Sequence, residues 1–199
     1  MSGAGGGVQG MPRPLFGMKL ILDLCGVTGA WSAPYREAGY DVDVVDLPRD
    51  VRLFRPPRRA HGVLAAPPCT MFCRMRMCRG EPSDEQFREA LSVVDACLRI
   101  AVVVRPKFWA LENPQGYLTR WLGPPQLRFD PCDFGDSWTK RTWIWGNFVP
   151  PMFKVAKPEQ PWISSRTGHP KRRKGIARNA VERSMTPPGF ARAFFEANP

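Results

Sequence analysis

The chain has 199 residues, of which 43% are hydrophobic, and it carries a formal net charge of +11 at pH 7 with a sequence pI of about 9.9. This length suits one domain with a buried core but is short for two. No apolar run approaches the roughly 20 residues of a membrane span, so we expect no membrane association. The positive excess favours a polyanionic partner, above all nucleic acid.

The cysteines and the N-terminus bear on the compartment. Residues 1–17 are Gly-rich and lack the apolar stretch of a secretory signal, and we interpret them as a disordered tail. The six cysteines are then expected to be reduced thiols in a cytoplasmic protein. Cys69, Cys73 and Cys78 are close in sequence, but their spacing is not that of a zinc-binding pair. We therefore expect no metal site.

The first half of the chain alternates short apolar runs with turns. Pro34 falls in the first turn of the helix expected there, where proline is tolerated. Pro67 and Pro68 cannot continue a sheet ladder, so the strand before them stops and the backbone turns. The expected elements are strands over 19–23, 42–45, 51–54 and 62–66 and a helix over 31–38.

The second half contains the longest predicted helix. Ser83 followed by Gln86 is the pattern of a capping box at a helix start, and Pro106 ends the helix. Its apolar residues at helical spacing are expected to face the core: Phe87, Leu91, Val94, Leu98 and Ala101. The expected elements are a helix over 83–104, a strand over 107–111, a short helix over 115–121, a strand pair at 132–135 and 142–148, and a helix over 189–197.

Alternating strands and helices indicate an α/β fold with a mostly parallel sheet. The carboxyl ends of parallel strands meet at one edge of a sheet, where such folds bind ligands. Polar or reactive groups stand at four of these ends: Asp23, Asp46, Cys69, and Glu112 with Asn113. Four such ends side by side predict a functional site at this edge.

Each of these residues has a functional and a structural interpretation. A thiolate at Cys69 is a potential nucleophile, and a small buried cysteine beside a turn is the alternative. Glu112 is a candidate acid, or a carboxylate that caps the next helix. Asp46 suits ribose hydroxyls, and both it and Asp50 are alternatively turn-forming acids. The glycine turn after Asp23 lets the backbone approach a ligand closely.

The order and spacing of these features resemble the DNA cytosine carbon-5 methyltransferase family, and most of all its compact phage members. Leu22 to Gly29 resembles the first family motif, Asp-Leu-Phe-x-Gly-x-Gly-Gly, and Pro67 to Cys73 resembles the catalytic motif, Pro-Pro-Cys-Gln-x-Phe-Ser. Further stretches resemble later motifs: Glu112-Asn113-Pro114, Asp133-Phe134-Gly135 with Lys140-Arg141, and Arg183 to Pro187. The resemblance covers roughly residues 19–198.

The resemblance implies a Rossmann-like class I S-adenosylmethionine-dependent methyltransferase fold with an antiparallel terminal hairpin. It implies that a cytosine flipped out of DNA is attacked at carbon 6 by Cys69 while Glu112, followed by Asn113, hydrogen-bonds ring nitrogen 3. Carbon 5 then takes the methyl group. Either Lys140 or Arg141 would steady the flipped base or its phosphate.

The resemblance also implies which residues bind the cofactor and the DNA. The implied contacts to S-adenosylmethionine are Asp23, Leu24, Cys25, Gly26, Thr28, Gly29, Trp31, Asp46, Asp50, Val51 and Pro67. The expected DNA contacts are Arg74, Arg76, Lys171, Arg172, Arg173 and Lys174. Between Ser164 and Ser184 there are seven Lys or Arg against one acid, which favours phosphate contact. A solvated run or a localisation signal is the alternative for residues 171–174.

The chain departs from the family pattern at several positions. In the first motif, Cys25 stands where the family has Phe, and Val27 stands where the family has the first glycine. In the catalytic motif, Thr70 stands where the family has Gln. After Phe148, about thirty-five residues of basic loop occupy the place of a target-recognition domain. We therefore expect weak or short sequence specificity.

The expected organisation is a tail at 1–17, a catalytic domain at 18–149, a basic loop at 150–184 and a C-terminal helix at 185–199 that packs on the catalytic domain, in a monomeric protein. Two other functions stay open. One is a related enzyme that acts on a nucleotide, on RNA or on a modified base. The other is an inactive homologue that binds DNA or the cofactor.

Overall fold

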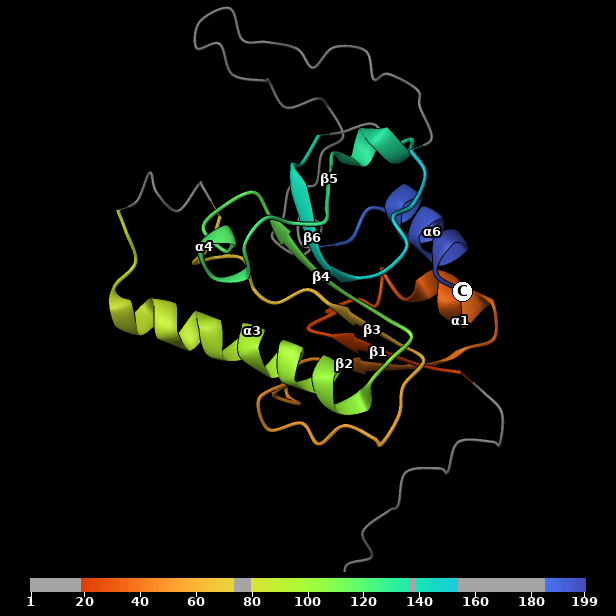
Figure 1. The fold of residues 1–199 in the computed structure, drawn as a ribbon, viewed down its shortest axis with the longest axis horizontal. Helices are drawn as coiled ribbons and strands as arrows, with labels where there is room; N and C mark the ends of the chain where they lie inside the picture. Colours follow the sequence, from red (N-terminus) through yellow and green to blue (C-terminus); the bar gives the residue numbers. More distant parts are fainter. Residues whose placement is uncertain (1–18, 74–79, 137–138, 154–184) are drawn as a thin grey trace, which may run out of the picture.

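In the computed structural model, which describes residues 19–73, 80–136, 139–153 and 185–199, six strands form one sheet in the order β2-β1-β3-β4-β6-β5 (Figure 1). Strands β1 to β4 are parallel, and β6 is antiparallel to both β4 and β5. This confirms the predicted fold class. The strands are β1 (Leu20–Leu24), β2 (Asp41–Val45), β3 (Gly62–Ala65), β4 (Phe108–Pro114), β5 (Leu127–Phe129) and β6 (Thr142–Asn147).

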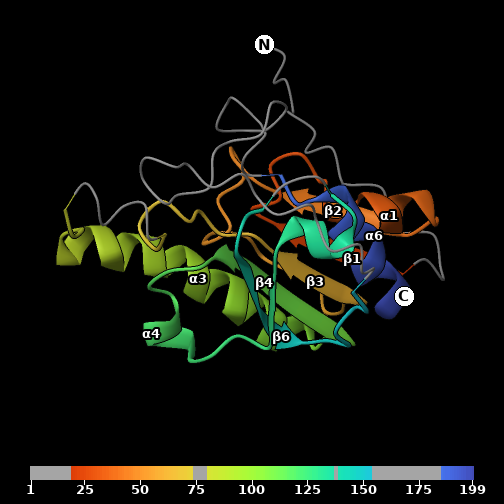
Figure 2. The ribbon, with the colours of Figure 1, turned by 90° about the horizontal axis from the view of Figure 1, so that it is seen from above.

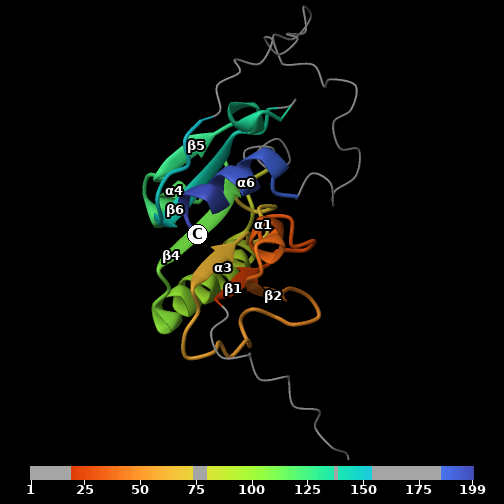
Figure 3. The same cartoon turned by 90° about the vertical axis from the view of Figure 1, so that its right-hand side faces the viewer.

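Helices cover both faces of the sheet (Figures 2 and 3). On one face Val94, Cys97 and Ile100 of α3 pack on buried side chains of β1, β3 and β4. On the other face α1 and α6 lie together, with the rings of Phe190 and Phe194 in the core. The helices are α1 (Ala33–Glu37), α3 (Asp84–Val104), α4 (Thr119–Leu122), α6 (Pro188–Ala197) and the 3-10 helix η1 (Pro131–Phe134).

Helix α3 begins where the sequence predicts, and α1 begins two residues later than predicted. Pro34 lies in the first turn of α1, and Ser83 and Gln86 form the predicted capping box of α3. The predicted stripe of α3 is correct in direction, since Val94 and Ala101 are buried, but the most buried face also includes Cys97, Ile100 and Val104. No helix within the described ranges is long and apolar enough to cross a membrane.

The strand order creates a crevice at the carboxyl ends of β1 and β3. From β1 the chain moves to β2 on one side and then crosses to β3 on the other side. Adjacent strands whose connections leave in opposite directions are separated by a crevice, and ligands of open α/β sheets bind there. The glycine turn after β1 and the Pro67-Pro68-Cys69 turn after β3 are therefore neighbours.

The predicted strand over 51–54 is wrong. Asp50 instead begins a turn, in which the Leu53 amide donates to the Asp50 carbonyl and the Arg52 amide donates to the Asp50 side chain. An Asp side chain that bonds its own backbone two residues on competes with strand pairing. The apolar side chain of Val51 is explained by its place in the core, where it is 4% exposed, and not by a position in the sheet.

The predicted strand at 132–135 is also wrong, because residues 132–134 belong to η1 and Gly135 is its C-cap. Asp130 and Asp133 form a capping box, and Pro131 has no amide hydrogen to donate to a ladder. The strand that pairs with β6 is β5. It has only three residues, which is too short for its hydrophobic pattern to indicate a strand.

Strand β4 is longer than predicted. It continues through Glu112 and Asn113 to Pro114, because β6 pairs with it over this whole stretch. Glu112 and Asn113 are thus inside a strand rather than in the loop after it. Their side chains gain the rigidity of the sheet.

Candidate active site

The turn that carries Cys69 is held by hydrogen bonds on both sides. Before the cysteine, the Asn113 side-chain amide donates to the carbonyl oxygen of Pro67 at 3.0 Å. After it, the Tyr117 amide donates to the carbonyl oxygen of Phe72 at 2.7 Å, and the Phe72 ring is fully buried. The backbone around Cys69 is therefore fixed to β4 and to the segment that follows it.

Gly116 permits this close approach. A Cβ at position 116 would lie 1.8 Å from the carbonyl oxygen of Phe72, which no side chain can occupy. Cys73 and Gly116 form an isolated β-bridge at the same place. Within the turn, the amides of Phe72 and Cys73 both donate to the Cys69 carbonyl at 2.9 Å. Glycine is thus a packing requirement of the turn.

Glu112 and Lys140 accompany the thiol of Cys69. Lys140 Nζ lies 3.4 Å from Glu112 Oε1, and Glu112 is only 9% exposed. Burial raises the pKa of the half-buried Cys69 thiol, the negative charge of Glu112 raises it further, and the positive charge of Lys140 opposes this rise. The structure therefore brings together Cys69, Glu112 and Lys140, from three segments far apart in sequence.

Arg141, the second basic residue of the predicted pair, faces a different partner. Its guanidinium donates to Gln115 Oε1 at 3.4 Å, and its carbonyl accepts from the Gln115 amide at 3.0 Å. No described contact joins Arg141 to Glu112 or Cys69. The geometry thus separates the two basic residues that the sequence left as alternatives.

The turn after β1 is built over the buried carboxylate of Asp23. Asp23 Oδ2 accepts from Ser32 Oγ at 2.5 Å, whereas Oδ1 has no hydrogen-bond partner among the described residues. Burial is the main cause that raises the Asp23 pKa to about 6, against the opposing hydrogen bonds of Ser32. Gly26 lies directly above, since a Cβ there would be 2.4 Å from Asp23 Oδ1.

The backbone of this turn adopts unusual angles. Cys25 has φ of 58° and Val27 has φ of 45°, in the left-handed region that non-glycine residues rarely occupy. The Cys25 amide donates to the Val45 carbonyl at 2.8 Å, which joins the ends of β1 and β2. Left-handed backbone of this kind persists where surrounding contacts impose it, and it is concentrated at ligand sites.

The two acids after β2 have different surroundings. The side chain of Asp46 accepts from the Leu47 amide at 2.9 Å, and its carbonyl accepts from the Arg49 amide at 2.9 Å. The carboxylate of Asp50 is paired with Arg52 at 2.6 Å, and hydrogen bonds from Arg52 lower the Asp50 pKa. Among the described residues the Asp46 carboxylate therefore has no ion-pair partner, whereas the Asp50 carboxylate is already oriented by Arg52.

Other predicted cofactor contacts are part of the core. Leu24, Trp31 and Val51 are at most 4% exposed, and the Trp31 ring packs on Phe190 and Phe194 of α6. Thr28 is exposed, and Gly29 and Pro67 are buried.

A hollow of about 690 Å³ lies on the α3 side of the Cys69 turn, lined by Pro68, Thr70, Met71, Glu85, Gln86, Arg88, Glu89, Ala90 and Val93.

Sequence reasoning missed three residues of this site. Ser32 and Gly116 belong to no recognisable sequence motif. Their importance depends on contacts made in the fold, of Ser32 with Asp23 and of Gly116 with the Phe72 carbonyl. Arg52 could have been noticed, since it stands two residues after Asp50 in an Asp-centred turn.

The predicted DNA contacts Arg74, Arg76, Lys171, Arg172, Arg173 and Lys174 lie outside the described residues, as do the tail and most of the basic loop. No group of three metal-ligating side chains occurs in the described part of the chain.

The chain thus has a Rossmann-like α/β fold of three layers, with a glycine turn over a buried acid and a proline-held cysteine near a glutamate at one edge of its sheet. No protein-family model matches the chain. A probable DNA (cytosine-5)-methyltransferase of Frog virus 3 (isolate Goorha) is 28% identical over 156 residues, which are 67% of this chain and 70% of the viral protein. The chain is thus similar in sequence to a probable DNA (cytosine-5)-methyltransferase, which confirms the resemblance that its motifs indicated.

Solved structures with a similar fold have low sequence identity. A putative DNA modification methyltransferase encoded within an E. coli prophage has a TM-score of 0.45 and 16% identity, covering 65% of this chain and 46% of that one. The S. pombe Dnmt2 methyltransferase has a TM-score of 0.42 and 14% identity, covering 78% and 58%. The chain therefore spans about half the length of these proteins.

Proposed function

We propose that the chain transfers a methyl group from S-adenosylmethionine to carbon 5 of cytosine in DNA through a covalent adduct of Cys69. The convergence of Cys69, Glu112 and Lys140 at the carboxyl ends of β3 and β4 carries this proposal. A nucleophile, an acid and a cation are the groups that addition to a pyrimidine ring requires. The similarity to the viral methyltransferase supports the same reaction.

The chemistry assigns a role to each residue. The Cys69 thiolate forms a bond to carbon 6 of the cytosine, and the electrons of the 5,6 double bond move onto the ring. Glu112 hydrogen-bonds ring nitrogen 3 and stabilises this charge, which makes carbon 5 nucleophilic. After carbon 5 has gained a methyl group, a base removes its proton and the thiolate leaves, which restores the double bond.

Lys140 has a defined electrostatic task in this scheme. Burial and the charge of Glu112 hold the Cys69 thiol protonated, since both raise its pKa. The positive charge of Lys140 works in the opposite direction, and thiolates form preferentially beside cations. We therefore assign Lys140, rather than Arg141, to the support of the nucleophile and the flipped base.

The residues at the ends of β1 and β2 fit the cofactor. Asp23 Oδ1 has no hydrogen-bond partner in the described structure, and Gly26 lets the backbone of the turn pack directly on this carboxylate at the end of β1. Asp46 and Asp50 would hold the adenosine portion. When bound, S-adenosylmethionine supplies the methyl group as an electrophile. Leu24, Cys25, Thr28, Gly29, Trp31, Val51 and Pro67 would shape the same pocket.

Charge supports DNA as the substrate. Of the 29 Lys and Arg residues, 13 lie outside the described ranges, whereas only 2 of the 18 Asp and Glu residues do, so the described part has sixteen of each and no net formal charge. The excess of +11 therefore belongs to the remaining segments, chiefly 74–79 and 154–184. The first directly follows the Cys69 turn and the second follows β6. We propose that these two segments contact DNA phosphates.

The organisation of the chain leads to the expected specificity. Residues 18–149 would form the catalytic domain and 150–184 a basic loop in place of a recognition domain, in a monomeric cytoplasmic protein. The C-terminal helix α6 packs on α1, and Tyr35 donates to the Asn198 carbonyl at 2.9 Å. With so short a loop to read bases, specificity would be weak or confined to a few bases.

Two experiments test this function. The protein and its Cys69→Ser variant are incubated with labelled S-adenosylmethionine and DNA, and label in 5-methylcytosine is measured. We expect incorporation by the unaltered protein only; incorporation that survives C69S would refute the assigned nucleophile. Bisulfite sequencing of the same DNA should show methylation at many short contexts, and methylation confined to one site longer than four bases would contradict weak specificity.

A further inference from the structure

We propose that Arg52 is a positioning residue that holds Asp50 in the orientation needed to contact the cofactor, by fixing the loop after β2 to helix α3. This inference rests on the proposed function, because it assumes that the cofactor binds at the carboxyl ends of β1 and β2. Arg52 itself would touch neither the cofactor nor the cytosine.

Arg52 holds the carboxylate of Asp50 at several atoms. Its Nε lies 3.0 Å from both Oδ1 and Oδ2 of Asp50, and its Nη2 lies 2.6 Å from Oδ2. The Arg52 amide donates to Oδ1 at 2.9 Å. A planar guanidinium that contacts both carboxylate oxygens fixes the plane of the carboxylate as well as its position.

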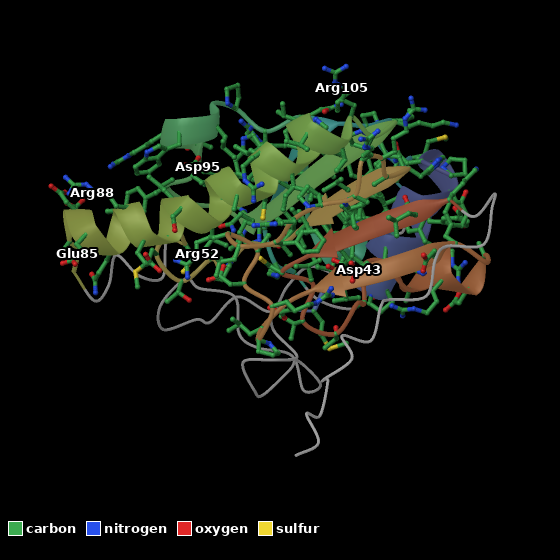
Figure 4. All side chains as sticks on the ribbon, turned by 90° about the horizontal axis from the view of Figure 1, so that it is seen from below. Asp43, Arg52, Glu85, Arg88, Asp95 and Arg105 are labelled. Atoms are coloured by element: carbon green, nitrogen blue, oxygen red, sulfur yellow. The ribbon has the colours of Figure 1, made fainter. Side chains whose placement is uncertain are left out.

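The other side of Arg52 is bound to α3. Its Nη1 donates to the carboxylate of Glu89 and, at 3.4 Å, to Ser92 Oγ. Its carbonyl oxygen accepts from Arg99 Nη2 at 3.4 Å, two turns further along the same helix. Figure 4 shows Arg52 alongside α3. Both the side chain and the backbone of Arg52 are therefore held to a rigid helix.

Other contacts hold the loop but none of them reaches the Asp50 carboxylate: Arg49 bonds to β2, Arg99 donates to the Phe54 carbonyl, and Val51 and Phe54 pack on the core. Leu47 and Leu53 are both 81% exposed, and Val51 is the apolar side chain of the turn that enters the core. No strand or helix occurs between Val45 and Gly62. Without the Arg52 contacts, Asp50 would have to lose its freedom when the cofactor binds, and that cost weakens affinity.

Arg49 in the same loop provides a matched control. Its guanidinium pairs with Asp43 at 2.5 Å and also bonds the Val44 carbonyl, both on β2. Its guanidinium contacts neither Asp46 nor Asp50 in the described structure, although its backbone amide donates to the Asp46 carbonyl at 2.9 Å. Both ion pairs are partly exposed, and such pairs contribute little to the stability of a fold. Loss of either arginine should therefore leave the free energy of unfolding nearly unchanged.

The test is isothermal titration calorimetry with S-adenosylhomocysteine, the product form of the cofactor. We expect Arg52→Gln to raise the dissociation constant about tenfold, Arg49→Gln to leave it unchanged, and Arg52→Lys to lie between, since lysine keeps the charge without the planar fork. At saturating cofactor, the turnover number of R52Q should equal that of the unaltered protein. A merely structural role would not separate affinity from turnover in this way.

A double variant of Asp50 and Arg52 tests whether Arg52 acts through Asp50. If Arg52 acts through Asp50, the Asp50→Asn and R52Q effects should not add, and the double variant should bind like D50N alone. Additive effects, or an R52Q variant that binds like the unaltered protein, would refute the inference while leaving the proposed function intact. Failure of the unaltered protein to bind would refute both.

Discussion

Asn113 on β4 donates a hydrogen bond of 3.0 Å to the carbonyl oxygen of Pro67, in the turn that carries Cys69 after the neighbouring strand β3. Asn113 is fully buried, so water cannot replace this bond. The relationship explains why Glu112 and Asn113 are adjacent. Both residues belong to β4. Glu112 lies near the Cys69 thiol, and Asn113 fixes the backbone of Pro67 before Cys69.

Replacing Asn113 by Ala should therefore damage catalysis more than folding. The carbonyl of Pro67 would lose its donor, which destabilises the fold by about 1–3 kcal/mol. Methyl transfer should fall about 100-fold, because small errors in the placement of a nucleophile are costly. Turnover and thermal unfolding measure the two effects. Asn147→Ala, at an exposed end of β6, is the control, and equal activity in both variants would contradict the assignment.

Gly116→Ala should prevent the Cys69 turn from docking. Its Cβ would meet the Phe72 carbonyl at 1.8 Å, so the backbone must move. We expect a loss of at least about 2 kcal/mol in the free energy of unfolding, measured by chemical denaturation. Gly80→Ala is the comparison, because a Cβ at Gly80 meets nothing within 4 Å and only its φ of +91° resists the change. A G116A variant as stable as G80A would show that the turn is not held at this point.

Stability should fall as the pH rises through the range in which Asp23 ionises. The folded protein raises the pKa of Asp23 from 3.8 to about 6, so between these values the folded state binds more protons than the unfolded state. The contribution of protonation is full below about pH 4 and is lost by about pH 6, a change on the order of 3 kcal/mol.

Asp23→Asn should remove this pH dependence, since an amide does not titrate. Urea unfolding at pH 4 and at pH 6.5 gives the comparison, with the exposed Asp95→Asn as control. The two variants should differ in the slope of stability against pH. If D23N keeps the slope of the unaltered protein, the burial of a protonated Asp23 is wrong.

Lys140→Met should raise the pKa of the Cys69 thiol further. The positive charge of Lys140 lowers the pKa of the Cys69 thiol, against the effects of burial and Glu112, and a backbone hydrogen bond acts in the same direction as Lys140. The pH dependence of alkylation at Cys69, followed by mass spectrometry, reports the pKa. We expect the alkylation midpoint to move to higher pH in K140M and to stay in place in Arg141→Met. A shift in R141M alone would return the choice between the two residues to Arg141.

The sequence predicted the strands and acids that lie along one edge of the sheet, because each depends on local pattern. Runs such as 62–66 are apolar, and Pro67 and Pro68 stop them. The capping box at Ser83 and Gln86 is likewise local. These features required no knowledge of tertiary contacts.

The errors arose where tertiary contacts override local pattern. Val51 is buried by a turn that Asp50 and Arg52 stabilise, and apolar character alone suggested a strand. β5 is too short to show periodicity, so its pairing with β6 depends on the rest of the sheet. The choice between Lys140 and Arg141 depends on which of them lies beside Glu112, and spacing does not reveal that.

The central claim is that Cys69 forms a bond to cytosine. DNA containing 5-fluorocytosine tests it most directly, because fluorine at carbon 5 cannot leave as a proton does, and the adduct is trapped after methyl transfer. With S-adenosylmethionine present, mass spectrometry should find the nucleotide attached at Cys69, and Cys73→Ser should form the same adduct. An adduct at another residue, or methylation of ordinary DNA with no trapped complex, would contradict the account.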